Sequence, residues 1–138
     1  MARILGIDPG TRRCGVAITD SARSMAFPRP ALGADGSLLA TLGELVRQEG
    51  VDLVVVGRPV ALSGKETAST EAADGLYTAI VEALAPLRVI QWDERLTTQE
   101  AQRSLSGAGM KAKDQRGRID SAAAVIMLQN YVDGLHAD

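Results

Sequence analysis

The sequence predicts an α/β fold, built on a mixed five-stranded sheet of three antiparallel strands followed by two parallel ones, with helices on both faces. The first 32 residues hold three short apolar segments separated by turn residues, which is typical of antiparallel strands. From residue 38 onward, helical patterns alternate with apolar runs of strand length, which is typical of parallel strands joined by crossovers. The 138 residues suffice for a single domain over residues 1–138 with a core of its own.

The three antiparallel strands are predicted at residues 3–8, 14–19 and about 25–32. The first becomes apolar and ends at Asp8, after which Pro9 and Gly10 supply turn chemistry, so the first two strands should form a hairpin. The third contains Pro28 and Pro30, which cannot donate backbone hydrogen bonds and confine this strand to an edge.

The middle of the chain alternates helices with strands. Apolar residues recur on one helical face at positions 38, 39, 42, 45 and 46, and Gly50 ends this helix. Residues 52–57 form a continuous apolar run, typical of a parallel strand buried on both sides. A loop with Pro59 and Gly64 leads to a helix at about 67–84 and a strand at 87–92.

Two further helices are expected near the C-terminus. Thr97 or Thr98 can cap a helix that runs to about residue 105, and a basic, glycine-containing segment follows it. The last helix is predicted at 119–133, and small residues at 121–124 would let it lie close to the sheet. One stripe of this helix comprises Ile119, Ala122, Ala123, Ile126 and Asn130.

Right-handed crossovers place strand 52–57 beside strand 3–8 and create a topological switch point at the end of the first strand. Asp8 stands at that end. Ligands of open α/β sheets bind beyond such strand ends, which gives Asp8 a functional interpretation beside its alternative as a turn-forming residue.

Composition excludes several classes of function. The formal net charge of −2 supplies no global field toward nucleic acid, so a basic site must be local. His136 is the one histidine, which leaves almost no support for a Ser-His-Asp triad. Cys14 is the one cysteine, which removes an intrachain disulfide and a thiolate zinc site and suits a cytoplasmic protein. We expect neither a signal peptide nor a membrane span, since no apolar run approaches about 20 residues.

Carboxylates are the remaining candidates for catalysis. Besides Asp8, the pair Asp93 and Glu94 follows the last strand, and at most one of the two faces the cleft because neighbours on extended backbone point to opposite sides. Asp120 stands in the first turn of the last helix. Each has a structural alternative: a solvated loop for the pair, and the helix dipole for Asp120.

The predicted topology brings these three places to one edge of the sheet. Three uncompensated anions at close quarters repel, whereas hard divalent cations with oxygen ligands stabilise them. Mg²⁺ or Mn²⁺ is therefore the expected cofactor, and a pair of such ions about 4 Å apart is the known arrangement for in-line phosphodiester hydrolysis.

Basic residues near these acids suit a phosphate backbone. Arg12 and Arg13 follow the Asp8 turn, and five cations precede Asp120, namely Arg103, Lys111, Lys113, Arg116 and Arg118. The alternative for this stretch is a solubilising loop. Aromatic residues are too few for a stacking platform, which favours contact with phosphates over base reading.

Five segments resemble the YqgF (RuvX) family, small bacterial ribonuclease H-like proteins described as Holliday junction resolvases and as pre-16S rRNA processing nucleases. The resemblance covers about the whole chain, and its most specific element is Asp-Glu-Arg-Leu-Thr-Thr. The segments are residues 6–11 (Gly-Ile-Asp-Pro-Gly-Thr), 15–17 (Gly-Val-Ala), 55–57 (Val-Val-Gly), 93–98 (Asp-Glu-Arg-Leu-Thr-Thr) and 119–124 (Ile-Asp-Ser-Ala-Ala-Ala).

The resemblance implies a ribonuclease H-like fold and an acidic triad of Asp8, Glu94 and Asp120 that holds the metal, so it selects Glu94 over Asp93. Arg95, within the most specific block, joins the expected nucleic-acid contacts. The sequence departs from the family at residues 57–59, where Gly-Arg-Pro replaces the usual Gly-Leu-Pro, and Arg58 either aids phosphate binding or decorates a loop. Many ribonuclease H-like nucleases also have an acid at that strand end, so the number of metal ions stays open.

The expected activity is hydrolysis of phosphodiester bonds in structured nucleic acid, with 5′ processing of precursor 16S rRNA favoured and junction resolution as the alternative. A non-catalytic nucleic-acid or protein-binding module is a second alternative. Sugar kinases with a similar Asp-x-Gly-Thr hairpin need two such domains, and 138 residues supply one. We expect a monomer or a weak homodimer.

Overall fold

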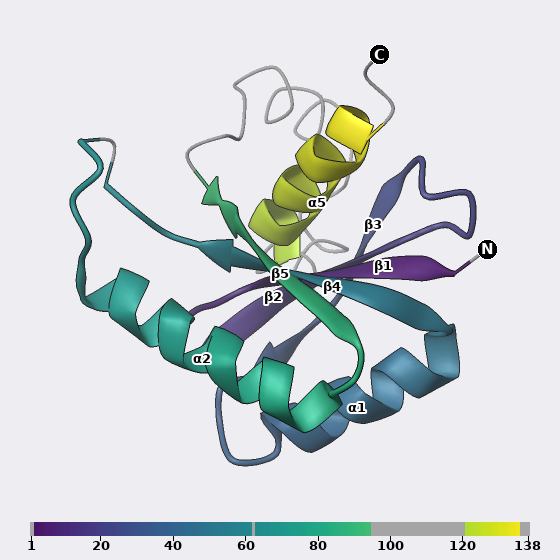
Figure 1. The fold of residues 1–138 in the computed structure, drawn as a ribbon, viewed down its shortest axis with the longest axis horizontal. Coiled ribbons are helices and arrows are strands. Elements are labelled where there is room, and N and C mark those ends of the chain that lie inside the picture. The colour runs from purple at the N-terminus through teal and green to yellow at the C-terminus, as the bar shows by residue number, and fades with distance from the viewer. Residues whose placement is uncertain (1, 62, 95–120, 136–138) are drawn as a thin grey trace, which may run out of the picture.

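The computed structural model describes residues 2–61, 63–94 and 121–135 and contains the predicted mixed sheet (Figure 1). Helices α1 and α2 lie on one face of the sheet and α5 lies on the other. The strand order is β3-β2-β1-β4-β5. The strands are β1 (Arg3–Asp8), β2 (Arg13–Thr19), β3 (Ala26–Gly33), β4 (Val51–Arg58) and β5 (Arg88–Asp93), and the helices are α1 (Leu38–Glu49), α2 (Ala68–Leu84) and α5 (Ala122–Leu135).

The pairing of the strands confirms the predicted topology. β1, β2 and β3 are antiparallel, whereas β4 runs parallel to both β1 and β5. The proline-containing β3 is an edge strand, as predicted. Ile7 pairs with Val56, and Gly57 pairs with Trp92, so the C-terminal ends of β1, β4 and β5 lie side by side at one edge of the sheet.

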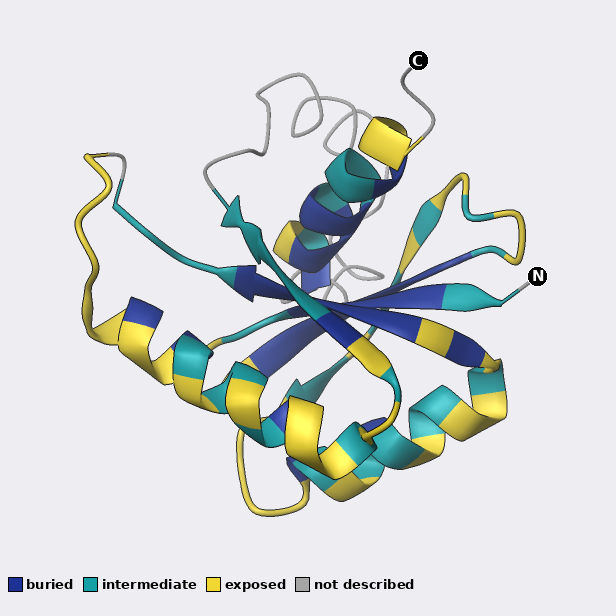
Figure 2. Cartoon of the chain, viewed as in Figure 1, coloured by how far each residue is buried: buried dark blue, intermediate teal, exposed yellow. Residues whose placement is uncertain are grey.

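Two apolar clusters hold the sheet between its helices. The cluster under α1 and α2 includes Leu5, Val54 and Leu42, and the cluster under α5 includes Val55 and Leu128. Because successive residues of β4 enter opposite clusters, this strand is buried on both sides, as its uninterrupted apolar run predicts (Figure 2).

Local sequence signals define the ends of the first two helices. Gly50 ends α1 in the left-handed region at φ 66°, where glycine carries no steric penalty. At the start of α2, Thr67 and Thr70 form a capping box in which each side chain satisfies the other residue's backbone N–H.

The stripe predicted for the last helix is wrong. Ala123 is exposed and Ile126 is only half-buried, and the buried face instead comprises Ala124, Val125, Met127, Leu128 and Val132. Nearly every residue of this segment is small or apolar, so its sequence supports several stripes equally well. The predicted close approach to the sheet does occur at Gly6, where an added Cβ would lie 3.1 Å from Cβ of Leu128.

The predicted helix that ends near residue 105 and the basic segment after it lie outside the described residues. Within the described ranges, no helix is both long and apolar enough to cross a membrane.

Candidate functional site

Asp8 stands at the C-terminal end of β1, on the α5 face of the sheet. Ile4 packs against α5, and side chains alternate along a strand, so Gly6 and Asp8 share its face. The chain then turns sharply at Gly10, where an added Cβ would lie 2.2 Å from the carbonyl oxygen of Arg13. Only glycine permits this tight return into β2, which fixes Asp8 at the rim of the sheet.

Glu94 follows β5 directly, and its side chain reaches the Asp8 carboxyl group across the end of β4. The two carboxyl groups share a side-chain hydrogen bond. Glu94 is thus the acid of the Asp93–Glu94 pair that meets Asp8. Asp93 lies close enough for its charge to contribute to the raised pKa of Glu94.

Gly57, between the two acids on β4, makes this contact sterically possible. A Cβ at Gly57 would lie 3.1 Å from both Cδ and Oε2 of Glu94 and 2.9 Å from Sδ of Met127. In the sequence, Gly57 belongs to a segment that resembles the family, and that resemblance implies no role for it. A glycine that ends an apolar, β-branched strand is the signal that could have identified it, because such a residue marks a close approach.

The electrostatics of the pair favour one shared proton. Burial is the largest cause that raises the pKa of Glu94, to about 8, and the hydrogen bond and charge of Asp8 raise it further. Burial also raises the pKa of Asp8, while its hydrogen bond from Glu94 lowers it. In the metal-free protein at neutral pH, Glu94 therefore holds the proton and donates it to the Asp8 carboxylate.

The residues present fit a hard divalent cation. Oε2 of Glu94 is buried and has no hydrogen-bond partner among the described residues, although buried carboxylate oxygens are normally satisfied. Two carboxyl groups in contact, one with an unsatisfied oxygen, are the donor set that Mg²⁺ or Mn²⁺ prefers. Within the described ranges, no group of three metal-ligating side chains forms, and the predicted third acid, Asp120, lies outside them.

Ser121, the residue after Asp120, anchors the beginning of the last helix to the sheet. Its buried hydroxyl accepts a hydrogen bond from the backbone N–H of Val16 at 3.0 Å and donates one to the carbonyl oxygen of Arg29 at 2.7 Å. Val16 and Arg29 are partners in the β2–β3 register directly beside its irregularity, so Ser121 bridges the two strands at that point. The α5 segment therefore enters the fold beside β2, the strand that follows the Asp8 turn.

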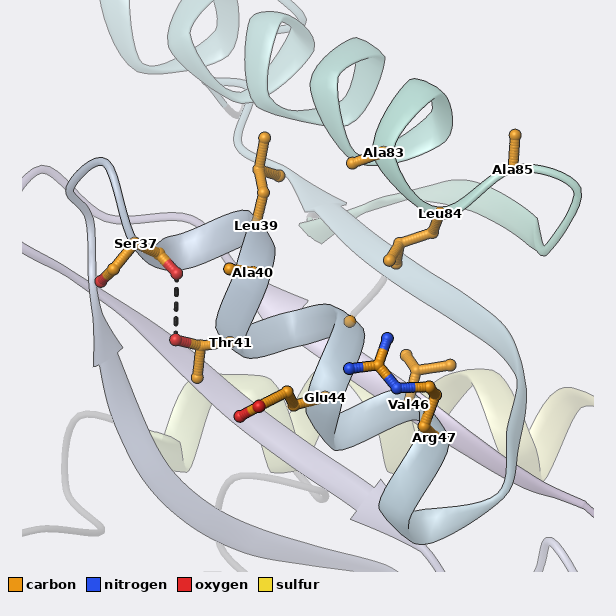
Figure 3. Close-up of a pocket in the computed structure, with 11 residues that line it drawn as sticks. Ser37, Leu39, Ala40, Thr41, Glu44, Val46, Arg47, Ala83, Leu84 and Ala85 are labelled. Carbon is orange, nitrogen blue, oxygen red and sulfur yellow. Dashed lines mark hydrogen bonds between the residues drawn. The ribbon is translucent and has the colours of Figure 1, made fainter.

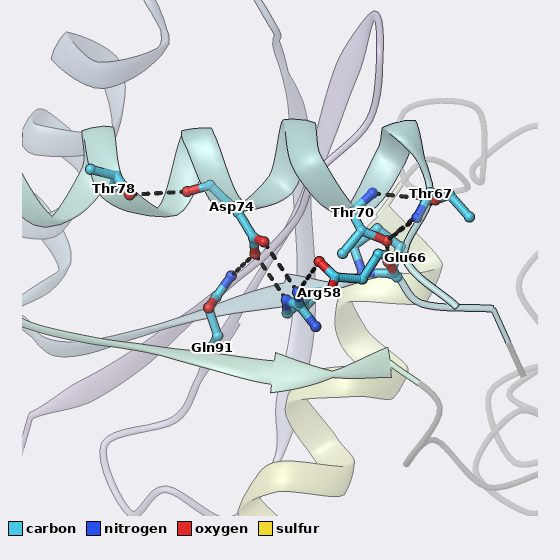
Figure 4. A network of polar contacts seen from close by, with 8 residues as sticks. Arg58, Glu66, Thr67, Thr70, Asp74, Thr78 and Gln91 are labelled. Carbon is cyan, nitrogen blue, oxygen red and sulfur yellow. Dashed lines mark hydrogen bonds and ion pairs between the residues drawn. The ribbon is translucent and has the colours of Figure 1, made fainter. Parts of the chain in front are cut away.

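The predicted cationic residues fall into three groups. Arg12 and Arg13 are exposed where the Asp8 turn enters β2. Arg58, at the end of β4, donates to Asp74 from Nε at 2.9 Å and to Glu66 from a terminal nitrogen at 2.9 Å (Figure 4). Arg95, Lys111, Lys113, Arg116 and Arg118 lie outside the described residues.

The Arg58 contacts belong to a network that joins β4, β5 and α2. Gln91 of β5 donates to Asp74 at 2.8 Å, so one carboxylate on α2 receives donors from both strands (Figure 4). Hydrogen bonds from Arg58 and Gln91 lower the pKa of Asp74, and Asp74 raises the pKa of Arg58. The network ties the ends of β4 and β5 to α2, next to Gly57 and Glu94. The sequence alone does not indicate this role for Arg58.

Cys14 is buried on the opposite face from Asp8. Burial is the main cause that raises the pKa of its thiol, and the Asp8 charge adds to this effect. At neutral pH the side chain is a neutral thiol, which is a poor nucleophile and a poor metal ligand.

A family profile and curated relatives match nearly the whole chain. The profile of the family described as "RuvX: Holliday junction resolvase" matches residues 2–134. A protein of Mycobacterium leprae (strain TN), named "Putative pre-16S rRNA nuclease", is 44% identical over 137 residues, which cover 98% of this chain and 74% of the relative. A Chlorobaculum tepidum protein of the same name is 36% identical over 133 residues, which cover 95% of this chain and 93% of the relative.

Solved structures share the fold at lower identity. Thermus thermophilus RuvC, in complex with a Holliday junction substrate, superposes with a TM-score of 0.63 at 17% identity, over 99% of this chain and 98% of RuvC. The Fowlpox virus resolvase, in complex with Holliday junction DNA, gives a TM-score of 0.59 at 12% identity, over 98% and 99% of the two chains. These two likenesses support the ribonuclease H-like fold. Because the family profile spans nearly the whole chain and relatives match it at 36–44% identity, this protein belongs to the RuvX family of nuclease and resolvase proteins.

Proposed function

We propose that this protein is a divalent-metal-dependent nuclease that hydrolyses phosphodiester bonds in structured nucleic acid. The single observation that carries the proposal is the Asp8–Glu94 pair at the C-terminal edge of the sheet, with its buried and unsatisfied Glu94 oxygen. Asp8, Glu94 and Asp120 would hold Mg²⁺ or Mn²⁺. The position of Ser121 beside β2 supports Asp120 as the third ligand, since Asp120 precedes it in the chain.

When bound, the metal would neutralise the carboxylates, polarise the scissile phosphate and lower the pKa of water. The chain's own residues would do the rest. Glu94 would give up the proton that it shares with Asp8, because metal ligands bind deprotonated. Arg12 and Arg13, with Arg95 and the basic residues before Asp120, would hold the phosphate backbone across the acids. Cleavage would leave 5′-phosphate and 3′-hydroxyl ends.

Precursor 16S rRNA, cut at its 5′ side in the cytoplasm during ribosome assembly, is the substrate that we favour. The names of the relatives at 36–44% identity support this choice. The description of the family profile supports the alternative, a four-way DNA junction. Both substrates present the same chemical bond to the same acids, so the choice depends on substrate shape rather than on the reacting groups.

The first test compares wild type with Asp8→Asn on labelled precursor rRNA and on a four-way junction, each with Mn²⁺. Asp8→Asn removes a metal-ligating charge at nearly constant shape, so we expect an intact fold and a loss of cleavage of at least about a thousandfold. Asp133→Asn is the matched control, since Asp133 is exposed on α5 and contacts Gln129. Near wild-type turnover by purified Asp8→Asn would refute the metal site. Binding without cleavage by the wild type would favour the non-catalytic alternative.

A further inference from the structure

A cavity of about 280 Å³ lies beside the β1–β2 turn, on the opposite face of the sheet from the Asp8 carboxyl group. Its walls are the turn at residues 9–11, the residues that lead into α1, and the first turns of α2. Cys14, Leu38 and Leu76, which also line it, belong to or pack against the α1–α2 core cluster. We call this cavity the turn pocket.

Residues that line the turn pocket follow the candidate active site directly in the sequence. Pro9, Gly10 and Thr11 line it and follow Asp8 directly. Asp8 pairs with Gly15, the neighbour of Cys14, so only the thickness of the sheet edge separates the acids from the pocket. A nucleic-acid strand with a phosphate at Asp8 would therefore need to pass one turn of chain to place a neighbouring group in the pocket.

The size and the walls of the pocket suit a small planar group. Drug-sized ligands occupy cavities of roughly 300–1,000 Å³, so about 280 Å³ fits a single nucleobase. Ala72, Leu38 and Leu76 offer apolar contacts for the faces of a ring. The hydroxyls of Thr11 and Ser69 have no hydrogen-bond partner within the described part of the chain, and each can donate or accept at a base edge.

The negative charge of Asp35 favours a base over a phosphate group as the occupant of the pocket. The Ser37 hydroxyl and backbone N–H hydrogen-bond to Asp35 and hold the pKa of this carboxyl group below its usual value, so Asp35 stays negative. A fixed carboxylate repels a phosphate group but accepts a hydrogen bond from a ring or amino N–H of a base.

We propose that the turn pocket binds the unpaired base of a nucleotide that neighbours the scissile phosphate. This role rests on the proposed nuclease function and deepens it, because it gives the enzyme a preference for substrates whose duplex is interrupted at the cut. An unpaired base costs less to extrude than a base that is paired and stacked in a duplex.

The chain offers a matched pair of variants that separates the pocket from the acids. Ala72 is exposed on α2 and lines the pocket, so Ala72→Phe fills the cavity without entering the core. Ala83 is exposed eleven residues later on the same helix, roughly 16 Å away. Ala83 lines a different groove, of about 700 Å³ between α1 and α2 (Figure 3), so Ala83→Phe is the control.

The experiment scans the base of each nucleotide around the cut. A substrate that the wild type cleaves is synthesised with one abasic nucleotide at a time on either side of the scissile bond. We expect one position at which loss of the base lowers kcat/KM about tenfold, comparable to the loss of one base contact. Ala72→Phe should cut the intact substrate about tenfold more slowly and should no longer respond to that abasic position, whereas Ala83→Phe should match the wild type.

A second experiment measures binding instead of cleavage with the same set of abasic positions. It tests the pocket independently of the nuclease function. Asp8→Asn is titrated with fluorescein-labelled RNA hairpins that carry a single-stranded 5′ flank, intact or abasic, and anisotropy gives Kd. An abasic position that weakens binding in Asp8→Asn, but not in the Asp8→Asn/Ala72→Phe double variant, supports the pocket even if the wild type cleaves nothing. Equal rates and equal Kd values across the scan, or wild-type behaviour of a folded Ala72→Phe, would overturn it.

Discussion

At the scale of single residues, the proton shared by Asp8 and Glu94 makes stability depend on pH. The pKa of Glu94 is about 8 in the folded chain and near its ordinary value of 4.5 in the unfolded chain. Between these values the folded state binds more protons, so the free energy of unfolding falls as pH rises from 4.5 to 8 and then levels off. We expect Glu94→Gln to remove most of this fall, which solvent screening of the half-buried pair limits to about 1–2 kcal/mol. Urea unfolding with EDTA at several pH values measures it, and identical pH profiles for the two proteins would contradict the shared proton.

The shared proton also predicts how metal binding depends on pH. Mn²⁺ must displace the proton from Glu94, so its affinity should rise with pH until about 8. Trp92, two residues before Glu94, reports binding through its fluorescence, and calorimetry in buffers of different ionisation enthalpy counts the protons released. An affinity that stays constant between pH 6 and 8 would contradict this linkage.

Gly57 is predicted not to tolerate a side chain. Gly57→Ala would place a methyl group 3.1 Å from the Glu94 carboxyl group and 2.9 Å from Sδ of Met127. We expect a loss of stability of about 1–3 kcal/mol from overpacking, and about a tenfold loss of Mn²⁺ affinity because Glu94 must move. Gly75→Ala is the control, since an added Cβ at Gly75 would have no atom within 4 Å. Gly75 lies inside α2, where alanine is favoured over glycine. Normal metal affinity in Gly57→Ala would show that Glu94 is not held by this contact.

The site residues differ in how far the sequence could predict them. Asp8 and Glu94 could be proposed because an acid that ends an apolar strand is visible locally, and the resemblance then selected Glu94 over Asp93. The steric role of Gly57 could not, because it depends on the neighbours that β4 acquires on folding. The same holds for Arg58, whose partner Asp74 lies 16 residues away on another element.

At the scale of elements, Ser121 is predicted to couple the last helix to the sheet. Ser121→Ala would remove the partner of the buried backbone N–H of Val16 and of the half-buried carbonyl of Arg29, at a cost of about 1–3 kcal/mol. Thr78→Ala is the control, because its exposed hydroxyl only donates back to Asp74 of the same helix. Chemical denaturation compares the two variants. Equal stability would show that water hydrogen-bonds to the Val16 N–H and the Arg29 carbonyl as well as Ser121 does.

The strands of the sheet could be predicted from the sequence, whereas the buried face of α5 could not. Strand period, turn residues and prolines identified β1 to β5, and right-handed crossovers then set β4 beside β1. The buried face of α5 was predicted wrongly, since its small and apolar residues occupy every side of the helix. What selects the true face is the sheet beneath it, where Gly6 leaves room for Leu128.

At the scale of the whole molecule, the proposed catalytic acids and the proposed base-binding pocket lie on opposite faces of the sheet. The acids lie on the α5 face, and the turn pocket lies on the α1–α2 face of the same edge. A net charge of −2 supplies no general attraction for nucleic acid, so the proposed function needs local affinity, which we assign to this edge and to the basic residues before Asp120 in the sequence.

The oligomeric state distinguishes the two substrates. A four-way junction has approximate two-fold symmetry, and symmetric cuts require two active sites related by a dyad, whereas one site suffices for a single cut in RNA. The large exposed apolar side chains of the described residues are few and are spread over three different elements, whereas a stable dimer buries a broad apolar surface; they are Met25, Phe27, Val81 and Leu135. We therefore expect sedimentation at micromolar concentration to give a species near the monomer mass of 14.5 kDa. On a junction, we expect unpaired incisions that are slower than the cut in precursor rRNA. A stable dimer that makes paired, symmetric incisions would reverse this preference and establish the junction as the better substrate.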